Sequence, residues 1–500
     1  MCTIYKGVHK NMETLAIKLK DILVSYQSKD ILDIKELSAY QGDVIGVIGR
    51  NGSGKSTLLK VIAGEIEPEG ALVQREVTFN YQPQIQEVDE TYRADVLQPD
   101  LMSRLHIPTN AVESLSGGEK HKYRLLQTLS VYELGLLLDE PTTHLDKTSV
   151  DYLIEELRYY YGTLIIVSHD RYFLNQLANK IWEVADGKVI EYSGNYDDYM
   201  ERKEQQIQQQ EEAYKQYQQE KNRLEKAAQK KEMQAQKAAK ASSKQNNRSI
   251  KPDRLSSSKQ KDTVQKSMHK SAKAIEKRIE QLDDVEGVVR HKDIVFPSVK
   301  HLQMHNDFPI RGYNIQLTRG DKLLIEGGSF QIPLGKKVAI IGDNGTGKST
   351  LLNHILNGGE GVTLSPKVAF GVYQQLDYQL ETDVPLLTYL MKQTEFDEAF
   401  VRAVLSNLGF KQTQVMTPLN KLSGGEATRI AMAEMFVKPS NVLILDEPTN
   451  FIDVFTIEAL EGFIQQYPGT VIFTSHDKEF VNRVADHVYQ IAQEKLIHLR

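Results

Sequence analysis

The sequence predicts an α/β protein in which two copies of one domain are joined by a long α-helical hairpin. Four motifs occur twice at matching spacings, and a basic segment poor in helix breakers lies between the two sets. Short apolar runs end in glycine or in polar residues, as buried parallel strands do. The chain has 500 residues, beyond the ~250–300 at which a single core stops growing, so more than one domain is expected.

The repeated motifs define the two copies. They are GRNGSGKST (49–57) and GDNGTGKST (342–350), LSGGE (115–119 and 422–426), LLLDEPT (136–142) and LILDEPT (443–449), and SHD (168–170 and 475–477). The serine of LSGGE precedes the glutamate of DEPT by 24 residues in both copies. This glutamate precedes the histidine of SHD by 29 residues in both. The shared order and spacing indicate an internal duplication.

Each copy is interpreted as an α/β ATPase core. VIGVIG (44–49) and KVAIIG (337–342) have the composition of buried strands, and the helix formers STLLKVIAGE and STLLNHILNG follow soon after. The same strand-then-polar pattern occurs in LGLLLDE and NVLILDE, and in TLIIVSHD and TVIFTSHD. Because ligands bind at the carboxyl ends of such strands, the polar residues after these runs are the candidate site.

The first motif, GxxGxGK[ST] between a strand and a helix, is a P-loop. Its glycines allow backbone N–H groups to surround phosphates at a helix N-terminus. Lys55 and Lys348 are expected to reach the β- and γ-phosphates, and Ser56 and Ser349 to bind Mg²⁺. The expected nucleotide-binding residues of the two loops are Gly49, Asn51, Gly52, Gly54, Lys55, Ser56 and Thr57, and Gly342, Asn344, Gly345, Gly347, Lys348, Ser349 and Thr350.

Acidic pairs at the ends of the next strands complete a hydrolytic site. Asp139 and Asp446 are expected to hold Mg²⁺, directly or through water. Glu140 and Glu447 follow at once and are placed to polarise the attacking water. A solvated strand-end carboxylate is the plain alternative, but both copies place the Asp-Glu pair identically.

Histidines and glutamines are the remaining site candidates. His169 and His476 follow the next strand, where a hydrogen bond to the γ-phosphate is expected. Gln84 and Gln375 are expected to join Mg²⁺ to a neighbouring helical subdomain, with the adjacent Gln82 and Gln374 as alternatives. The span from Gln84 to Ser116 is 32 residues and that from Gln375 to Ser423 is 48, which predicts a helical insert that is trimmed in the first copy.

LSGGE predicts how the two copies meet. A serine and two glycines at a helix start offer backbone amides to a phosphate, yet the P-loop of the same copy does not need them. The motif makes sense if each ATP lies between the P-loop of one copy and the LSGGE of the other, so that two ATPs clamp the copies together. The residues expected there are Ser116, Gly117 and Gly118, and Ser423, Gly424 and Gly425.

The charge of the chain is unevenly distributed. The net charge is −6, but residues 201–280 hold 21 Lys and Arg against 11 Asp and Glu. One long helix is predicted at about 196–241 and a second at about 263–283, with 242–262 as the tip of a hairpin. No aromatic residue lies in 218–295, which favours phosphate contacts over base stacking. A solvated spacer is the alternative to a polyanion-binding arm.

Other features predict a cytoplasmic protein. No apolar run approaches the ~20 residues that cross a bilayer. The N-terminal residues lack the apolar core of a secretory signal. Cys2 is the only cysteine, so neither a disulfide framework nor a CxxC zinc site is expected.

Together these residues resemble the ATP-binding cassette (ABC) ATPases, and two cassettes in one chain without membrane segments resemble the ABC-F group. GNYDDYMERKEQQ (194–206) is similar to the sequence with which ABC-F linkers begin, and EPTTHLD (140–146) is similar to their D-loop. The resemblance implies two tandem ABC-type P-loop ATPase domains with a helical hairpin linker. The expected parts are an N-terminal extension (1–11), domain 1 (12–200), the linker (201–300, tip 242–262) and domain 2 (301–500), with Met1 or Met12 as the start.

Two departures leave the equivalence of the ATP sites open. The second D-loop reads EPTNFID, with Phe451 and Ile452 where the first has His144 and Leu145. Tyr26 is the expected adenine-stacking residue of the first site, whereas the equivalent place in the second copy holds Arg319, whose guanidinium plane can also stack. Both glutamates are retained, so both sites are expected to hydrolyse ATP with Mg²⁺.

Within the group, the chain is most similar to antibiotic-resistance proteins of the Vga and Msr type. The resemblance implies a monomer that binds ribosomal and transfer RNA on the ribosome, with the linker tip displacing tRNA and a bound drug. ATP hydrolysis then releases the protein. The alternatives are a housekeeping ABC-F translation factor, the ATPase subunit of a drug exporter, and a DNA-associated ATPase, since a basic arm does not distinguish RNA from duplex DNA.

Overall fold

The computed structural model describes residues 14–26, 29–84, 117–143, 145, 147–245, 270, 273–275, 277, 294–297, 300–320, 322–373, 383–422, 424–450 and 452–500. Residue contacts group the chain into two compact units, one formed by Met1–Tyr199 with His291–Arg500 and the other by Met200–Arg290. The first unit contains both copies of the repeat, which we call cassette 1 and cassette 2. Among the described residues, no helix is long and apolar enough to cross a membrane.

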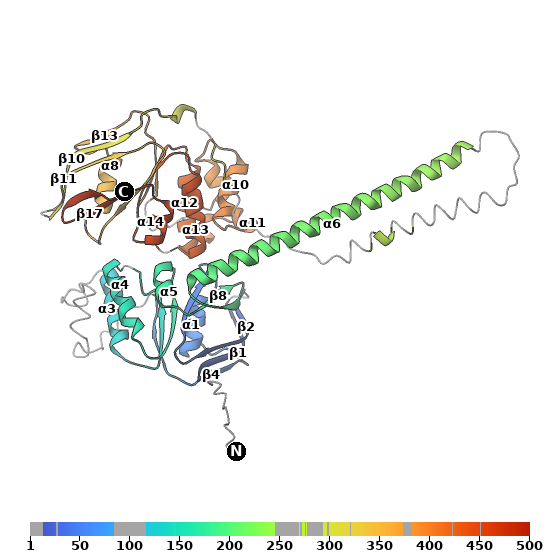
Figure 1. The fold of residues 1–500 in the computed structure, drawn as a ribbon, viewed down its shortest axis with the longest axis horizontal. Coiled ribbons are helices and arrows are strands. Elements are labelled where there is room, and N and C mark those ends of the chain that lie inside the picture. The colour runs from blue at the N-terminus through green and yellow to red at the C-terminus, as the bar shows by residue number, and fades with distance from the viewer. Residues whose placement is uncertain are drawn as a thin grey trace, which may run out of the picture. The chain divides into compact units, whose positions relative to one another are not determined.

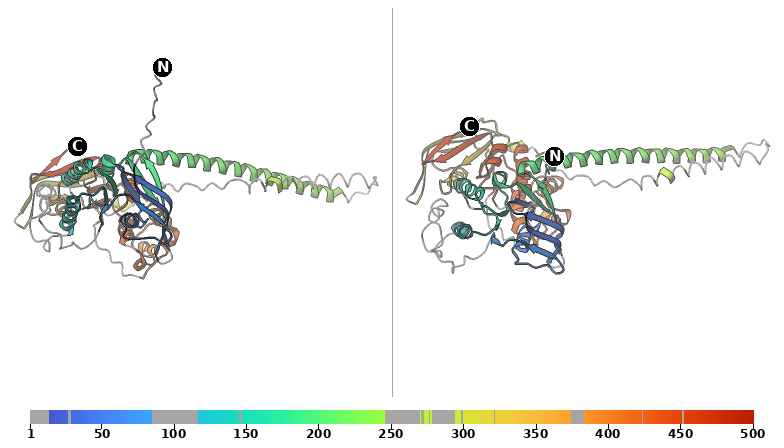
Figure 2. Two further views of the ribbon diagram at one scale, coloured as in Figure 1. Left: turned by 90° about the horizontal axis from the view of Figure 1, so that it is seen from below. Right: turned by 60° about the horizontal axis from the view of Figure 1, so that its bottom comes forward.

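Cassette 1 contains one antiparallel and one mainly parallel sheet. Its strands are β1 (Leu15–Tyr26), β2 (Lys29–Tyr40), β3 (Val44–Gly49), β4 (Leu72–Arg75), β5 (Phe79–Gln82), β6 (Gly135–Asp139), β7 (Thr163–Val167), β8 (Lys180–Ala185) and β9 (Lys188–Ser193). Its helices are α1 (Lys55–Ala63), α3 (Gly117–Ser130), α4 (Lys147–Arg158) and α5 (Arg171–Leu177). The antiparallel sheet has the order β2-β1-β4, and its blue strands are visible in both views of Figure 2.

Cassette 2 repeats this plan. Its strands are β10 (Ile310–Arg319), β11 (Lys322–Ile332), β12 (Lys337–Ile341), β13 (Val362–Leu364), β14 (Phe370–Tyr373), β15 (Val442–Leu445), β16 (Thr470–Thr474), β17 (His487–Ala492) and β18 (Lys495–His498). Its α-helices are α8 (Lys348–Leu356), α9 (Leu386–Met391), α10 (Glu398–Asn407), α11 (Gln412–Val415), α12 (Gly424–Val437), α13 (Val454–Gln466) and α14 (Lys478–Val484), and its 3₁₀ turns are η3 (Lys300–Leu302) and η4 (Leu419–Lys421). Helices α10–α13 lie on one side of this cassette and β10, β11 and β13 on the other (Figure 1).

The two six-stranded sheets have the same topology. The strand orders are β5-β6-β7-β3-β8-β9 and β14-β15-β16-β12-β17-β18, parallel except for the final antiparallel strand. The strand that precedes each P-loop is therefore central, and it lies beside the strand that ends in SHD. This adjacency places the P-loop and the histidine at the same carboxyl edge of the sheet.

The parallel sheet of cassette 1 is buried on both faces. Leu137 and Ile165 pack in one apolar cluster with α1 and the antiparallel sheet, whereas Leu136, Leu138 and Ile166 pack in a second cluster with α4. Alternate residues of a strand point to opposite faces, so a strand covered on both sides reads as a continuous apolar run. The predicted strands and the two helices after the P-loops are confirmed.

The helical insert of cassette 2 is confirmed by α9, α10 and α11. Asp397 caps α10 by accepting a hydrogen bond from the backbone N–H of Phe400 at 2.9 Å, and the apolar side of the helix packs in the core of the cassette. The corresponding region of cassette 1, residues 85–116, lies outside the described residues.

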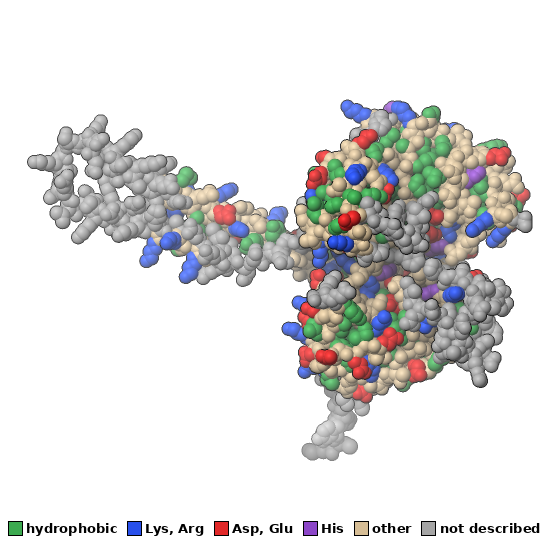
Figure 3. Space-filling model, turned by 180° about the vertical axis from the view of Figure 1, so that it is seen from behind, with side chains coloured by type: hydrophobic (Ala, Val, Ile, Leu, Met, Phe, Trp, Pro, Cys, Tyr) green, Lys and Arg blue, Asp and Glu red, His purple; other side chains and the backbone are tan. Residues whose placement is uncertain are grey.

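The second unit begins within the long helix α6 (Tyr196–Gln245). The helix ends four residues beyond the predicted residue 241, because the run of Ala, Lys, Ser and Gln contains no helix breaker. Lys and Arg side chains project along its described part (Figure 3), and the exposed ones are Arg202, Lys215, Arg223, Lys226, Lys230 and Lys231. The rest of the predicted tip, 246–262, lies outside the described residues, as does most of the second predicted helix.

Candidate active site

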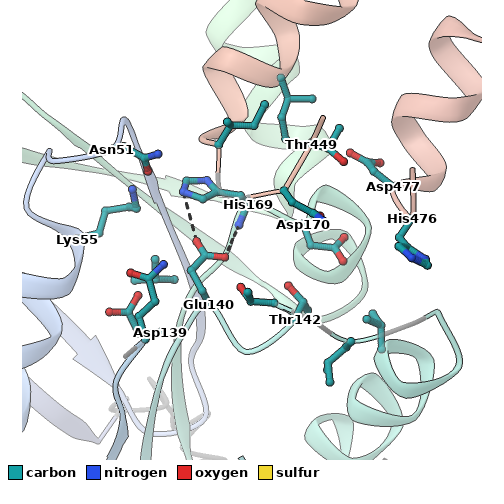
Figure 4. Close-up of a pocket in the computed structure, with 18 of the residues that line it drawn as sticks. Asn51, Lys55, Asp139, Glu140, Thr142, His169, Asp170, Thr449, His476 and Asp477 are labelled. Carbon is teal, nitrogen blue, oxygen red and sulfur yellow. Dashed lines mark hydrogen bonds and ion pairs between the residues drawn. The ribbon is translucent and has the colours of Figure 1, made fainter. Parts of the chain in front are cut away.

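A cavity of about 1280 Å³ brings the motifs of the two cassettes together (Figure 4). From cassette 1 it is lined by the P-loop, by Asp139 and Glu140 after β6, and by His169 after β7. Residues of cassette 2 also line it, including Asn344, Glu447 and His476. Motifs that are far apart in the sequence therefore share one cavity.

The first P-loop is shaped by glycine. Gly54, immediately before α1, has a φ of 104°, in the left-handed region that glycine adopts without strain. A Cβ atom on Gly49 would lie 2.5 Å from the carbonyl oxygen of Val184, so only glycine fits there without a shift. The Nζ atom of Lys55 donates to the backbone oxygens of Gly49 at 2.9 Å and Arg50 at 3.2 Å. The lysine is thus held across its own loop, where a phosphate charge would compensate its burial.

The second P-loop repeats this geometry with additional contacts. Lys348 Nζ donates to the oxygens of Gly342 at 3.0 Å and Asp343 at 3.2 Å. It also lies 2.9 Å from His476 Nε2 and 3.7 Å from Glu447 Oε1. Burial lowers the pKa of both P-loop lysines. At the second site, the lysine, the histidine and the glutamate are therefore already in contact.

The two glutamates have matching partners. Glu140 Oε1 lies 3.3 Å from His169 Nε2, and Glu447 Oε1 lies 3.2 Å from His476 Nε2. Burial raises the pKa of Glu140 to about 8 and that of Glu447 to about 7. Burial and then the Lys55 charge lower the pKa of His169 to about 3, so this imidazole is neutral. A carboxyl group with a pKa near neutrality is suited to accept a proton from water.

Oxygen donors lie where Mg²⁺ is expected. Asp139 is buried, and burial raises its pKa although the Ser56 hydroxyl of the P-loop lowers it, so a cation beside it would stabilise the charged form. Gln84 lines the same cavity. In cassette 2, Asp446 Oδ1 accepts a hydrogen bond from the Thr474 hydroxyl at 2.7 Å. Carboxylate, hydroxyl and amide oxygens are the ligands that Mg²⁺ prefers, so these residues fit the ion.

The cassettes contact each other at the first P-loop. The backbone N–H of Asn51 donates to Asp453 Oδ2 at 2.9 Å. Asp453 ends the second D-loop, and its other carboxylate oxygen accepts from the backbone N–H of Thr456 at 2.9 Å as the N-cap of α13. One carboxylate thus joins the P-loop of cassette 1 to a helix start of cassette 2.

The structure groups the predicted site residues unevenly. Of those predicted, the cavity is lined by Tyr26, Asn51, Gly52, Gly54, Lys55, Ser56, Thr57, Gln84, Asp139, Glu140, His169, Asn344, Glu447 and His476. Gly49, Gly342, Gly345, Gly347, Lys348, Ser349, Thr350 and Asp446 lie in the loop, helix and strand-end positions that the motifs predict but do not line it. Gly117 and Gly118 begin α3, and Gly424 and Gly425 begin α12. Ser116, Gln375 and Ser423 lie outside the described residues.

The structure bears on two alternatives that the sequence left open: the choice between Gln82 and Gln84, and the equivalence of Tyr26 and Arg319. Gln82 is fully buried at the end of β5 and does not line the cavity, whereas Gln84 does, which favours Gln84. Tyr26, at the end of β1, is 52% exposed and lines the cavity beside Ile31, an arrangement open to a flat ring. Arg319 is exposed at the end of β10 and is not among the lining residues.

Sequence reasoning missed the residues through which one cassette completes the site of the other. Asp453 is the last residue of EPTNFID, as Asp146 is the last residue of EPTTHLD. The repeat therefore indicates the position of Asp453, but it does not indicate that Asn51 is its partner. Thr428 and Lys122 line the cavity and follow the two LSGGE motifs by two and three residues. Thr449 and Asn450, within the second D-loop, also line it.

The sequence is similar to known proteins over nearly its whole length. Residues 32–143 and 325–450 match the ABC transporter family, and residues 182–249 match a second family of the same description. The chain is 46% identical to the erythromycin resistance ATP-binding protein MsrA of Staphylococcus epidermidis, over 97% of this chain and 99% of that protein. It is 35% identical to the ribosome protection protein VmlR of Bacillus subtilis, over 93% and 84%. It is 29% identical to the energy-dependent translational throttle protein EttA of Escherichia coli, over 93% and 90%.

The fold is similar to solved structures of distant sequence. RNase-L Inhibitor superposes with a TM-score of 0.61 at 16% identity, covering 96% of this chain and 91% of that chain. An archaeal ribosome recycling factor, solved in complex with a ribosomal stalk protein, gives a TM-score of 0.62 at 17% identity, covering 96% and 90%. At this identity, the likeness supports the fold alone.

Proposed function

Because the chain belongs to the ABC-F group of ATP-binding cassette ATPases, and within it to the Msr and Vga antibiotic-resistance type, we propose that it protects ribosomes from antibiotics. The drugs would be those that act at the peptidyl-transferase centre or the exit tunnel. Two relatives are named for erythromycin resistance and for ribosome protection, and the chain covers most of both. A ribosomal partner would require the protein to act in the cytoplasm.

The protein is an ATPase, and the cavity shared by the cassettes is the observation that carries the proposed mechanism. One ATP would lie on each P-loop, with Lys55 and Lys348 holding phosphate oxygens. At the first P-loop, residues of cassette 2 that line the same cavity as Lys55 would supply the opposite wall. Ser56, Asp139 and Gln84 would hold Mg²⁺, which supplies positive charge to the phosphates. Glu140 and Glu447 would each accept a proton from the attacking water, with His169 and His476 held beside them.

The linker would be the part that acts on RNA. Exposed Lys and Arg side chains along α6 favour contacts with phosphate, which position a protein without reading sequence. We propose that two bound ATPs close the cassettes, and that closure holds a monomer on the ribosome while the tip at 242–262 displaces tRNA and drug. Hydrolysis then opens the cassettes and releases the protein.

Co-sedimentation with ribosomes tests the proposal. The Glu140→Gln/Glu447→Gln variant binds ATP but lacks both bases, so it is expected to remain on ribosomes with ATP and to dissociate with ADP. The matched control adds Lys55→Ala and Lys348→Ala, which prevents phosphate binding, and should not be retained with either nucleotide. Absence of retention while two ATPs are bound per chain would rule out the ribosomal role.

The linker is tested separately in cell-free translation with erythromycin. Removal of 242–262 is expected to abolish drug protection while ATP-dependent ribosome binding persists. Protection in a membrane-free extract excludes export as the mechanism. If the protein lowers drug accumulation in cells and gives no protection in the extract, the exporter alternative is correct.

A further inference from the structure

Arg171 is a buried cation that joins the two cassettes. It is the first residue of α5 in cassette 1, and its side chain is 1% exposed. Its Nη2 atom donates to Glu461 Oε1 on α13 at 2.6 Å and to Asp477 Oδ2 at 3.1 Å, both in cassette 2. Burial alone lowers an arginine pKa, but these carboxylates outweigh it and raise the pKa of Arg171. A buried charge paired in this way fixes the positions of the groups around it.

Arg171 and Asp477 each lie close in sequence to the histidine of an SHD motif. Arg171 follows His169 by two residues, and Asp477 directly follows His476. Asp170 and Asp477 cap α5 and α14 by accepting hydrogen bonds from the backbone N–H groups of Phe173 and Phe480. Each histidine therefore lies just before a short helix, and the starts of these two helices are joined by the ion pair between Arg171 and Asp477.

Contacts and adjacent residues form a continuous path between the sites. Glu140 contacts His169, the chain leads through Asp170 to Arg171, and Arg171 binds Asp477 beside His476. His476 in turn contacts Glu447. Every non-covalent step of this path is an ion pair or hydrogen bond of 3.4 Å or less. The two histidines are therefore joined by an unbroken chain of contacts and adjacent residues.

The repeat is asymmetric at this position. Lys478 is the equivalent of Arg171 in cassette 2, but its side chain is 35% exposed and its Nζ lies 3.8 Å from Asp151, which is 42% exposed. It also lies 4.2 Å from the ring centre of Tyr172. Exposed pairs of this kind contribute little, whereas arginine can bind two carboxylates at once. The buried connection between the cassettes is therefore made by Arg171.

We infer that Arg171 is a positioning residue that couples the two ATP sites, holding the His169 and His476 loops in register so that each site depends on the other. Its Nε and Nη1 atoms are buried without a hydrogen-bond partner among the described residues. The guanidinium thus has donors left for a second arrangement of the loops. The inference rests on the proposal that each cassette binds one ATP.

Single-turnover hydrolysis at one site at a time tests the coupling. A Glu140→Gln chain hydrolyses only at the second site, and a Glu447→Gln chain only at the first. Arg171→Met, in cassette 1, is expected to slow the second site, and Asp477→Asn, in cassette 2, the first, each roughly 3- to 30-fold. Within either background, adding the second of these substitutions to the first should slow the remaining site by less than the product of their separate effects, because both remove the same contact.

The controls separate coupling from damage. Arg158→Met also removes an arginine contact to α5, the bond to Gln176, but within cassette 1, and it should leave the second site unchanged. Arg171→Lys keeps the buried charge and Asp477→Asn keeps a good N-cap, so they provide folded variants if Arg171→Met unfolds. Melting of each variant identifies those that are folded.

The outcomes are distinct. If Arg171→Met and Arg171→Lys slow only the first site, and Asp477→Asn only the second, then Arg171 does not couple the sites and the inference is wrong. Filter binding to the Glu140→Gln/Glu447→Gln variant checks the premise independently: two ATPs per chain are expected. One ATP per chain would refute the two-site proposal instead, whatever the effect of Arg171.

Discussion

Glu140 and Glu447 have a left-handed backbone, with φ of 54° and 45°. For a residue with a side chain this conformation is unfavourable by about 1–2 kcal/mol, and it persists where surrounding contacts hold it. Here the N–H of Glu140 donates to Val167 O at 2.9 Å, and that of Glu447 donates to Thr474 Oγ1 at 2.8 Å. The next parallel strand thus fixes each glutamate, which directs its carboxylate at the histidine of the following motif.

The raised pKa values of these glutamates predict how stability changes with pH. In the folded protein, Glu140 and Glu447 stay protonated at pH values where the unfolded chain has already lost these protons. The stability that this protonation contributes is present at low pH and is lost as the pH rises through about 7–8. The Glu140→Gln/Glu447→Gln variant lacks this loss. Without nucleotide, its free energy of unfolding at pH 8.5 should exceed that of the wild type by several kcal/mol, since one pKa unit is about 1.4 kcal/mol. The difference should shrink towards pH 5.5.

Calorimetry of both proteins across this pH range checks the prediction. Titrating groups that are distant from the two glutamates are common to both chains, so their contributions cancel in the difference. A difference that is constant from pH 5.5 to 8.5 would mean that the glutamates titrate normally in the folded protein.

Helix α6 is anchored by its first turn. Tyr196 and Tyr199 are each 1% exposed, their rings are 5.8 Å apart, and Tyr199 makes an edge contact with Tyr192 of β9 at 5.0 Å. The Tyr196 hydroxyl donates to Glu458 on α13 at 3.4 Å. From Glu201 onward most described side chains are at least partly exposed. Buried side chains therefore stabilise the start of the helix, whereas the helix propensity of its residues stabilises the remainder.

Two tyrosines of the same helix give a matched comparison. Tyr199→Ala should destabilise the protein by about 3–5 kcal/mol, because a large buried ring leaves a cavity. Tyr214→Ala should change stability by less than ~0.5 kcal/mol, because Tyr214 is 36% exposed and its ring contact with Tyr217 is a distant 6.5 Å. Urea unfolding measures both. Similar effects of the two substitutions would show that the first turn is not the anchor.

The fold could be predicted from the sequence more fully than the site. Strands such as VIGVIG and the helix over 196–241 follow from local composition and periodicity, which act within a few residues. Asn51 and Asp453 are 402 residues apart, and Arg171 and Glu461 are 290 apart. Such pairs depend on how the two cassettes pack, and local periodicity carries no information about that. The repeat predicted that the cassettes meet, but not which side chains do so.

Asp453 has two roles that substitutions can separate: it contacts Asn51 of cassette 1, and it caps α13. Asp453→Ser retains a capping hydroxyl for α13 but is too short for a second acceptor, so stability should change by less than ~0.5 kcal/mol. Loss of the bond to Asn51 should raise the ATP concentration for half-maximal hydrolysis roughly tenfold. Asp453→Ala, which loses both bonds, should in addition lower stability by about 1 kcal/mol.

Steady-state hydrolysis and thermal melting of the two variants decide this prediction. An unchanged ATP requirement in Asp453→Ser would mean that the contact with Asn51 has no part in the closed state. Equal melting of the Ser and Ala variants would mean that the cap of α13 is not formed by this side chain.

The unbroken length of α6 has a mechanical consequence. Fifty residues in one helix extend about 75 Å at ~1.5 Å per residue. A tilt of about 5° at the first turn would carry the far end of such a helix through about 7 Å. Tyr196 binds Glu458, one helical turn from the Glu461 that receives Arg171. Because the first turn of α6 contacts the same helix as Arg171, a small tilt there would be amplified along the length of α6.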